Sequence, residues 1–255
     1  MQKMVYYEQP LNERVRTLLR LELLFQQSDH FLAGQTCWDS RGALNSLIDI
    51  LEVLNRADLK TEYIKEMERQ GNALSQLKER PEVDKKQLDT ILQQLDSYSD
   101  QLIGISGVLG QELRQNELIN NIKQRSAIAG GTCDFDLPML HFWLEQSVEN
   151  RQYDLKLWHQ LLRPVRHAND LLIKLMRESA SPQKKVADNG FFQQALESSN
   201  HYQMIRIGVN PEDNTFPEVS GGRHRFTVRF MEASITSRPQ QVHKPVNFQL
   251  TLSGL

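Results

Sequence analysis

Residues 171–195, LLIKLMRESASPQKKVADNGFFQQA, decide the fold class, because the hydrophobic pattern of the chain changes within them. Before about residue 180, leucines recur at the three- and four-residue spacing that is typical of amphipathic helices. After it, β-branched and aromatic residues alternate with polar ones, and Gly and Pro interrupt the runs. The sequence therefore predicts an α+β protein. It combines a mainly α-helical domain over residues 12–180 with a smaller antiparallel β-strand domain over residues 1–11 and 181–255.

The clearest strand of the β part covers residues 223–231, RHRFTVRFM. Its apolar residues point to one face and its arginines to the other, because side chains alternate along a strand. The apolar residues are Phe226, Val228 and Phe230, and the arginines are Arg223, Arg225 and Arg229. Further strand-like runs lie at residues 190–193, 202–207 and 246–252, and a run at residues 4–8 is expected to join the same sheet. The pattern indicates an antiparallel sheet with one solvated face.

In the helical part, a first helix is expected after Pro10 with Asn12 as its N-cap, and a second from residue 39 or 40 to residue 55. Residues 58–80 and the segment from residue 84 onward carry narrow apolar stripes with polar residues on all other sides. These two segments predict an antiparallel hairpin that projects from the body. Such a hairpin suits dimerisation, and the alternative is a peripheral hairpin of a monomeric bundle.

Two further features mark helix boundaries. A fifth helix is expected over residues 110–128, followed by a Gly-containing loop over residues 129–138. Pro164 lies inside a later leucine-rich helical region. Proline there ends one helix and begins another, or kinks a single helix.

Composition excludes several classes of protein. The 30 Lys and Arg residues and 32 Asp and Glu residues give a formal net charge of -2, so no global basic field favours nucleic acid. The 2 cysteines, Cys37 and Cys133, do not form a secreted disulfide framework. The N-terminal residues MQKMVYYEQP contain no apolar core of signal-peptide length, and no stretch reaches the roughly 18 apolar residues that a membrane span needs. We therefore expect a cytoplasmic protein with no membrane contact.

Motifs that would indicate catalysis are missing from the sequence. It contains no phosphate-binding loop, dinucleotide fingerprint, nucleophile elbow or zinc-protease motif. The pair Gly130 and Gly131 lies between helices, so we interpret it as a connector. The cysteines and histidines lack the spacing of a zinc site. We expect no enzyme activity, no small-molecule substrate, no cofactor and no metal.

Local clusters of arginine are the most distinctive feature. Arg16 and Arg20 lie one turn apart on the first helix, and a ladder of three arginines lies on the strand at residues 223–231. Arginine side chains suit carboxylates, so the clusters favour a groove for an acidic or mixed-charge peptide. Internal pairing with Asp or Glu is the alternative for each arginine. Nucleic acid could use the same ladder, although the negative net charge weighs against it.

Arg56 directly follows the second helix. A cation there interacts favourably with the negative end of the helix dipole. We interpret Arg56 mainly as a cap of this helix, and binding of a partner is the alternative.

Four stretches along the whole chain together resemble one known family. They are MQKMVYYEQPLNERVRTLLRLELL at residues 1–24, AGGTCDFDLPMLHFWL at residues 129–144, NGFFQ at residues 189–193 and RHRFTVRFM at residues 223–231. Their order and the overall length are similar to those of the ZapD family of Z-ring-associated proteins. The predicted hairpin matches this family mainly in pattern.

The resemblance implies a homodimer that binds the C-terminal tail of FtsZ, crosslinks its protofilaments and stabilises the Z-ring at midcell. It implies no catalytic activity and no cofactor. Arg20 and His141 stand at positions that are charged or titratable in the family. A basic residue is also implied midway along the fifth helix, where this sequence has Asn116 and Glu117, with Arg114 and Lys123 nearby. The partner-binding residues that we expect are Arg16, Arg20, Arg56, His141, Arg223, Arg225 and Arg229. The alternative function is a nucleic-acid-binding protein, or another cytoplasmic dimeric adaptor, that uses an arginine groove.

Overall fold

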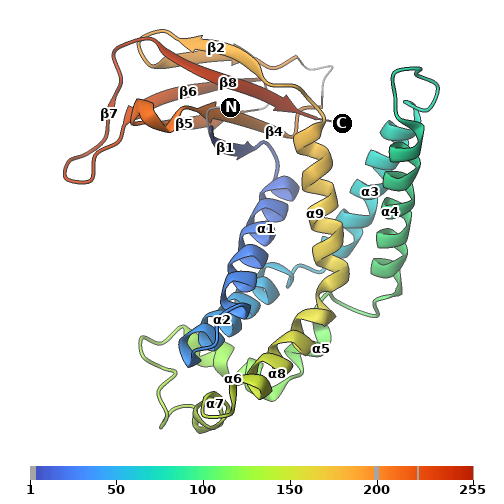
Figure 1. The fold of residues 1–255 in the computed structure, drawn as a ribbon, viewed down its shortest axis with the longest axis vertical. Coiled ribbons are helices and arrows are strands. Elements are labelled where there is room, and N and C mark those ends of the chain that lie inside the picture. The colour runs from blue at the N-terminus through green and yellow to red at the C-terminus, as the bar shows by residue number, and fades with distance from the viewer. Residues whose placement is uncertain (1–3, 198–200, 223, 255) are drawn as a thin grey trace. The chain divides into compact units, whose positions relative to one another are not determined.

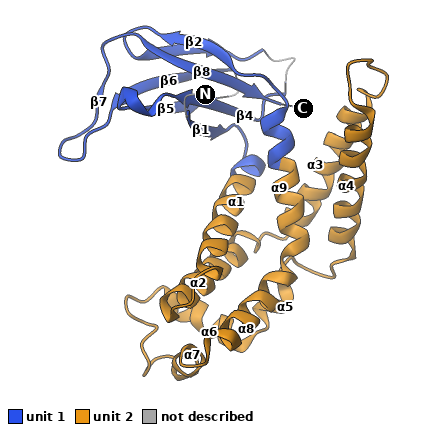
Figure 2. Ribbon diagram, in the orientation of Figure 1, with its two compact units in different colours: residues 1–16, 173–255 blue, residues 17–172 orange. Residues whose placement is uncertain are grey.

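The protein has an α+β fold with two compact units in the computed structural model (Figures 1 and 2). The structure describes residues 4–197, 201–222 and 224–254. The β unit comprises residues 1–16 and 173–255, and the helical unit comprises residues 17–172. The boundary between the units falls within the first and the last helix of the chain.

The helices follow the leucine pattern of the sequence. They are α1 (Glu13–Leu32), α2 (Cys37–Val53), α3 (Leu59–Ser75), α4 (Lys85–Gly104), α5 (Gln111–Arg114), α6 (Glu117–Ser126), α7 (Pro138–Leu144), α8 (Val148–Leu161) and α9 (Arg163–Glu178). Leucines of α1 and α2, including Leu21, Leu47 and Leu51, are fully buried in the helical unit. The burial of such side chains is the main source of its stability.

Side-chain caps fix the start of the first two helices. The Asn12 Oδ1 accepts a hydrogen bond from the backbone N–H of Val15 at 2.9 Å, which confirms the predicted N-cap of α1. Helix α2 begins at Cys37, slightly earlier than predicted, because Thr36 and Asp39 form a reciprocal capping box. The Asp39 side chain accepts a hydrogen bond from the Thr36 N–H, and the Asp39 N–H donates to the Thr36 hydroxyl.

Proline and asparagine decide the later boundaries. Helix α8 ends at Leu161 and α9 begins at Arg163, so Pro164 stands in the first turn of a new helix, one of the two outcomes predicted. The prediction of a single fifth helix over residues 110–128 was wrong. The side chain of Asn116 accepts a hydrogen bond from the N–H of Ile119 and starts α6 separately from the short α5.

Helices α3 and α4 form the predicted hairpin, packed along each other (Figure 2). The turn end of the hairpin extends beyond the other helices of the helical unit. The buried residues of α3 follow one stripe, which includes Tyr63 and Met67. The hydroxyl of Tyr63 donates to Asn169 of α9 at 2.7 Å, and the Tyr98 ring of α4 lies 5.3 Å from the His167 ring. The hairpin is therefore anchored to α9.

The β unit contains two antiparallel sheets among the described residues, where the sequence indicated one. The strands are β1 (Val5–Pro10), β2 (Gln183–Ala187), β3 (Phe191–Ala195), β4 (Met204–Val209), β5 (Thr215–Gly221), β6 (Arg225–Glu232), β7 (Gln240–Gln241) and β8 (Val246–Ser253). One sheet has the order β1-β4-β8-β2. The other has the order β3-β6-β5, with β7 also paired to β6. Strand β1 pairs with β4, which confirms that the N-terminal run joins the sheet.

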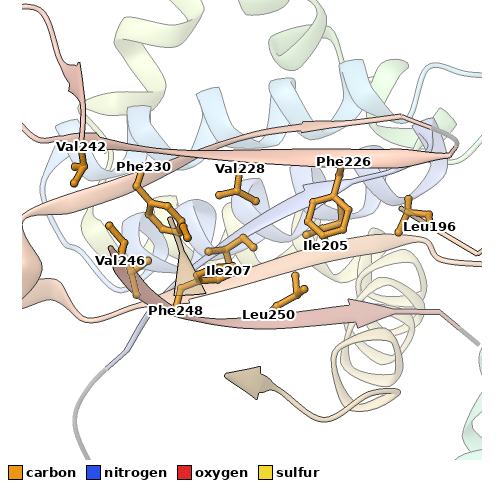
Figure 3. Packing of buried hydrophobic residues seen from close by; sticks show 12 residues of the cluster. Leu196, Ile205, Ile207, Phe226, Val228, Phe230, Val242, Val246, Phe248 and Leu250 are labelled. Atoms are coloured by element: carbon orange, nitrogen blue, oxygen red, sulfur yellow. The ribbon is translucent and has the colours of Figure 1, made fainter. Parts of the chain in front are cut away.

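The core of the β unit lies between the two sheets (Figure 3). Phe226, Val228 and Phe230 of β6 face Ile207 of β4 and Phe248 of β8 across this core. The rings of Phe230 and Phe248 have centroids 5.1 Å apart, a distance typical of favourable aromatic pairs. The predicted alternation of β6 is therefore confirmed, with its apolar face buried and its arginine face outside.

A charged cluster on the outer face of the β1-β4-β8-β2 sheet links β1 to β4 and to α9. Glu8 of β1 accepts two hydrogen bonds from Arg177 of α9, at 2.8 and 2.7 Å, and pairs with Arg206 of β4 at 3.0 Å. The Arg206 guanidinium also lies 4.0 Å from the centre of the Tyr6 ring. Tyr6 packs over Gly208, where a Cβ atom would lie only 2.8 Å from the ring, so this approach requires glycine.

Candidate partner-binding surface

The open face of the β3-β6-β5 sheet, the face turned away from the core, carries two exposed arginines. Arg225 and Arg229 lie on β6 and alternate with the buried Phe226 and Val228. Within the described part of the chain, neither guanidinium has a hydrogen bond or an ion pair. Both charges are therefore free to bind an acidic group. Arg223, the third arginine of the predicted ladder, lies outside the described residues.

Strand register defines the neighbours of these arginines. Arg229 stands opposite Phe191 of β3 on one side and Glu218 of β5 on the other. Arg225 stands opposite Ala195 of β3. The small methyl group of Ala195 leaves the space beside Arg225 open. Glu218 gives Arg229 a negative neighbour that Arg225 lacks, so Arg225 is the more available of the two charges.

Between these arginines, the middle of the open face is polar and uncharged. Thr227 of β6 stands opposite Gln193 of β3 and Ser220 of β5. Hydroxyl and amide groups of this kind donate and accept hydrogen bonds. The face therefore combines separated positive charges with neutral hydrogen-bonding groups, an arrangement that suits a mixed-charge peptide.

The two arginines of α1 have different surroundings. Arg16 forms an ion pair with Glu13 one turn earlier, at 3.2 Å, and remains partly exposed. Arg20 is exposed and has no ion pair within the described ranges. An exposed pair such as Arg16 and Glu13 is weak, so both arginines can bind an anion.

Arg56 is held by acidic residues next to it. Its guanidinium pairs with Asp58 at 3.1 Å and with Glu62 at 3.0 Å, and reaches Thr17 at 3.5 Å. The hydrogen bond with Asp58, followed by the charge of Glu62, raises the pKa of Arg56 above its ordinary value. The hydrogen bonds of Arg56 thus go to Asp58 and Glu62 near the start of α3 and to Thr17 of α1. Its role as a cation at the negative end of the α2 dipole stays a prediction.

His141 is exposed on α7, next to apolar side chains that the sequence analysis did not single out. Phe135 is 80% exposed, Phe142 is 69% exposed and Met139 is 49% exposed. These three residues are spaced four and three residues apart in the sequence. Helix α7 has only 7 residues, and so short a segment gives no reliable indication of which face is buried. His141 therefore lies on a helix that also exposes Met139 and Phe142.

The basic residues near the centre of the predicted fifth helix serve the fold. Arg114 donates to the backbone carbonyls of Leu109 and Leu51, at 2.8 and 2.7 Å. Lys123 pairs with Glu52 of α2 at 2.9 Å. Neither presents a free charge to a partner.

A concave surface of about 480 Å³ lies between α2, α6 and the loop that follows α6. Its ionisable lining residues are Arg41 and Asp49. Arg41 donates to the hydroxyl and the carbonyl of Thr132, at 2.9 and 3.1 Å. Burial, followed by the charge of Glu52, raises the pKa of Asp49. Of its hydroxyl groups, that of Ser126 donates to the carbonyl of Lys123 at 2.8 Å and that of Thr132 accepts from Arg41.

Residues 4–197, 201–222 and 224–254 contain no group of three or more His, Cys, Asp or Glu side chains that could hold a metal ion. None of the helices described has both the length and the apolar character needed to cross a membrane. Cys37 and Cys133 are free and exposed.

Comparison with known proteins gives the family. Residues 19–229 match the family model ZapD, which is described as a cell division protein. A cell division protein ZapD from Methylococcus capsulatus is 41% identical over 252 residues, which cover 99% of both chains. Proteins of the same name from Aromatoleum aromaticum and Dechloromonas aromatica are 36% identical over 254 residues and 38% identical over 253 residues. They span 100% and 99% of this chain, and 99% and 100% of the respective relatives. The chain belongs to the ZapD family of cell division proteins.

Proposed function

We propose that this protein binds the C-terminal tail of FtsZ and crosslinks FtsZ protofilaments, so that it stabilises the Z-ring at midcell. In this proposal it acts in the cytoplasm as a homodimer, without catalysis or a cofactor. The observation that carries the proposal is the exposed, unpaired charge of Arg225 and Arg229 on the open face of the β3-β6-β5 sheet, within the described part of the chain. Family membership supports the role in division.

The chemistry of the open face supports a peptide that carries carboxylates. Arginine binds a carboxylate through two parallel hydrogen bonds, and such charge-assisted bonds are stronger than neutral ones. Arg225 and Arg229 point to the same face because they lie four residues apart on one strand. A partner with acidic groups at matching intervals along an extended segment can therefore contact both.

Crosslinking follows from weak binding at more than one site. A flexible tail loses conformational entropy when it docks, so a single site should bind in about the micromolar range. A homodimer presents two sites, and a filament presents many tails. The effective concentration of the second tail then converts weak contacts into a stable crosslink.

The test is charge reversal at Arg225. We expect Arg225→Glu to weaken binding of an FtsZ tail peptide by about 10-fold or more, since hydrogen bonds to charged groups contribute about 1.5–3 kcal/mol each. Lys184→Glu is the matched control, because it makes the same change in charge at an exposed position of the other sheet. Fluorescence anisotropy measures the affinity, and low-speed co-sedimentation with GTP-assembled FtsZ measures bundling.

Co-sedimentation is carried out both with full-length FtsZ and with FtsZ that lacks its C-terminal tail, so that bundling through the tail is distinguished from bundling through another part of FtsZ. Bundles that pellet only when the tail is present, and that are lost with Arg225→Glu but kept with Lys184→Glu, agree with the proposal. Retained tail binding by Arg225→Glu would remove the open face from the mechanism.

A further inference from the structure

We infer that the partner peptide binds as an added strand along the outer edge of β3 at Gln193 and Ala195, with a carboxylate in the row of Arg225. This inference rests on the proposed function and specifies how the tail is held. It follows from three observations: the free backbone groups of Gln193 and Ala195, the lack of proline or charged residues in β3, and the position of Arg225 in the strand register.

Strand β3 is the terminal strand of its sheet in the order β3-β6-β5. The N–H of Leu196 donates to His224, and the N–H of Phe230 donates to Gly190, so even-numbered residues of this strand bond to β6. Hydrogen-bonded and non-hydrogen-bonded pairs alternate in an antiparallel ladder. The N–H and C=O groups of Gln193 and Ala195 therefore point away from β6, towards the free edge. Neither residue has a backbone hydrogen-bond partner on that side within the described residues.

The other terminal strands carry the usual protection against pairing with another chain. Natural edge strands are blocked by proline or by charged side chains, especially lysine. Strand β1 ends in Pro10, β2 contains Lys184 and Lys185, and β5 contains Pro217 and Glu218. Strand β3, with the sequence FFQQA, contains neither proline nor a charged residue. Strand β7 also lacks both, but it has only two residues, and a very short edge strand is itself a form of protection. Strand β3 is thus the edge best suited to accept an extended peptide.

The register of β3 and β6 places an added peptide within reach of Arg225. Residues directly opposite each other on neighbouring strands share one face of a sheet. A peptide residue opposite Ala195 would therefore lie in the row of Arg225, at two strand spacings, or roughly 10 Å, from β6. Only the methyl group of Ala195 lies between them, so the long side chain of Arg225 can extend over it to a carboxylate.

The open edge does not reach the other end of β3. Asp188 forms a bridge with Phe191, whose N–H donates to the Asp188 carbonyl at 2.9 Å, so the position beside Phe191 in the row of Arg229 is taken. The occupant that fits is therefore an extended peptide that pairs with Gln193 and Ala195 and places a carboxylate opposite Ala195. Strand addition supplies affinity through main-chain hydrogen bonds, and the side-chain rows supply specificity.

The test removes the backbone donor of β3 at its free edge. Gln193→Pro deletes an N–H that faces solvent, and proline is tolerated in edge strands when its ring is on that side. Gln193→Ala is the matched control, because it keeps the N–H and removes only the side chain. With a fluorescein-labelled FtsZ tail peptide and the full-length protein, we expect Gln193→Pro to weaken binding by about 10-fold and Gln193→Ala to bind like the unsubstituted protein. Circular dichroism melting checks that both variants fold.

The peptide offers a second measurement that does not depend on folding of the proline variant. Backbone N-methylation at successive peptide positions should weaken binding in alternation, because only every second N–H of an added strand faces β3. Equal effects at successive positions would overturn strand addition. Equal binding by Gln193→Pro and Gln193→Ala, with loss in Arg225→Glu, would also overturn it but leave the proposed function standing. No binding by the unsubstituted protein would overturn both.

Discussion

His159 shows how a single buried residue links the stability of the helical unit to pH. Its Nδ1 lies 2.7 Å from the carbonyl oxygen of Leu155, and its Nε2 contacts the hydroxyl of Ser28. A carbonyl only accepts hydrogen bonds, so Nδ1 carries the proton and Nε2 accepts from Ser28 when the ring is neutral. Burial lowers the pKa of His159 below its ordinary value of 6.5, and the charge of Arg166 adds to this effect. The hydrogen bond to Leu155 and the charge of Asp29 oppose it.

The sign of the pH effect follows from this lowered pKa. The unfolded chain binds a proton on His159 at a higher pH than the folded protein does, so acid favours unfolding. We expect the free energy of unfolding to fall as the pH drops through about 6.5 towards the folded pKa. Urea denaturation at about pH 7.5 and about pH 5.5 measures this fall in the free energy of unfolding. The fall between the two pH values should be smaller for His159→Gln than for the unsubstituted protein. His141→Gln, at an exposed position, is the control and should keep the full loss.

The contrast between Arg56 and Arg225 is also a matter of single residues. Both were expected as partner-binding residues, with a helix cap as the other interpretation of Arg56 and internal pairing as the other interpretation of Arg225. Arg56 has Asp58 and Glu62 within 3.1 Å, whereas Arg225 has no ion pair within the described ranges. The acidic partners of Arg56 follow it closely in sequence, and the strand neighbour of Arg225 is an alanine. The availability of a charge therefore depends on which residues the fold places beside it.

At the scale of elements, β1 depends on Glu8. This carboxylate receives a bidentate pair from Arg177 of α9 and an ion pair from Arg206 of β4, and all three side chains are mostly buried. Two cations on one carboxylate offset the cost of removing it from water better than one would. The cluster thus joins the N-terminal strand to a neighbouring strand and to the last helix.

We expect Glu8→Gln to lower the free energy of unfolding by about 2 kcal/mol, because the change removes the charge that holds both arginines. Urea denaturation followed by circular dichroism measures the effect. Glu232→Gln is the control at an exposed position of β6 and should change stability by less than about 0.5 kcal/mol. Equal effects of the two substitutions would mean that the cluster contributes little to folding.

Three strands, β6, β2 and β5, show how well strands can be predicted from the sequence. The alternation of Phe226, Val228 and Phe230 predicts β6 because one face is buried and the other is exposed. Strand β2 carries two lysines, and β5 carries Pro217 and ends in Gly221, so neither was predicted. Both are edge strands, where pairing with one neighbour is enough and composition is less constrained.

At the scale of the whole molecule, crosslinking requires two tail-binding sites in one particle. The sequence indicates the α3–α4 hairpin as a dimerisation element, and this stays a prediction. Helix α8 offers another surface, because Tyr153, Leu157 and Leu161 are 68%, 46% and 41% exposed at four-residue intervals. A stripe of this kind matches the packing of one helix against another.

We therefore expect Leu157→Asp to convert the proposed dimer into monomers that still bind the tail peptide but no longer bundle filaments. Sedimentation velocity measures the mass of the particle, and co-sedimentation measures bundling. Lys156→Asp, one position earlier and also exposed, is the control for the added negative charge. If Leu157→Asp remains dimeric, α8 is not the dimer interface, and the α3–α4 hairpin is the surface to test next.

Patterns in the sequence are enough to predict the fold class, the N-cap of α1, the helix boundary at Pro164, the hairpin and the two faces of strand β6. These features depend on local rules: side-chain periodicity, capping and the missing N–H of proline. Four stretches of the sequence also resemble the ZapD family, and the comparisons show that the chain belongs to this family.

Only the tertiary structure decided how the strands divide into two sheets and which charges remain free. Both depend on residues far apart in the chain, such as Glu8 with Arg177 and Arg206, or Ala195 beside Arg225. A sequence pattern specifies which face of a strand is buried, but not which strand pairs with it. The open edge of β3 is visible only once its neighbours are known, because an edge is defined by the strand that is absent.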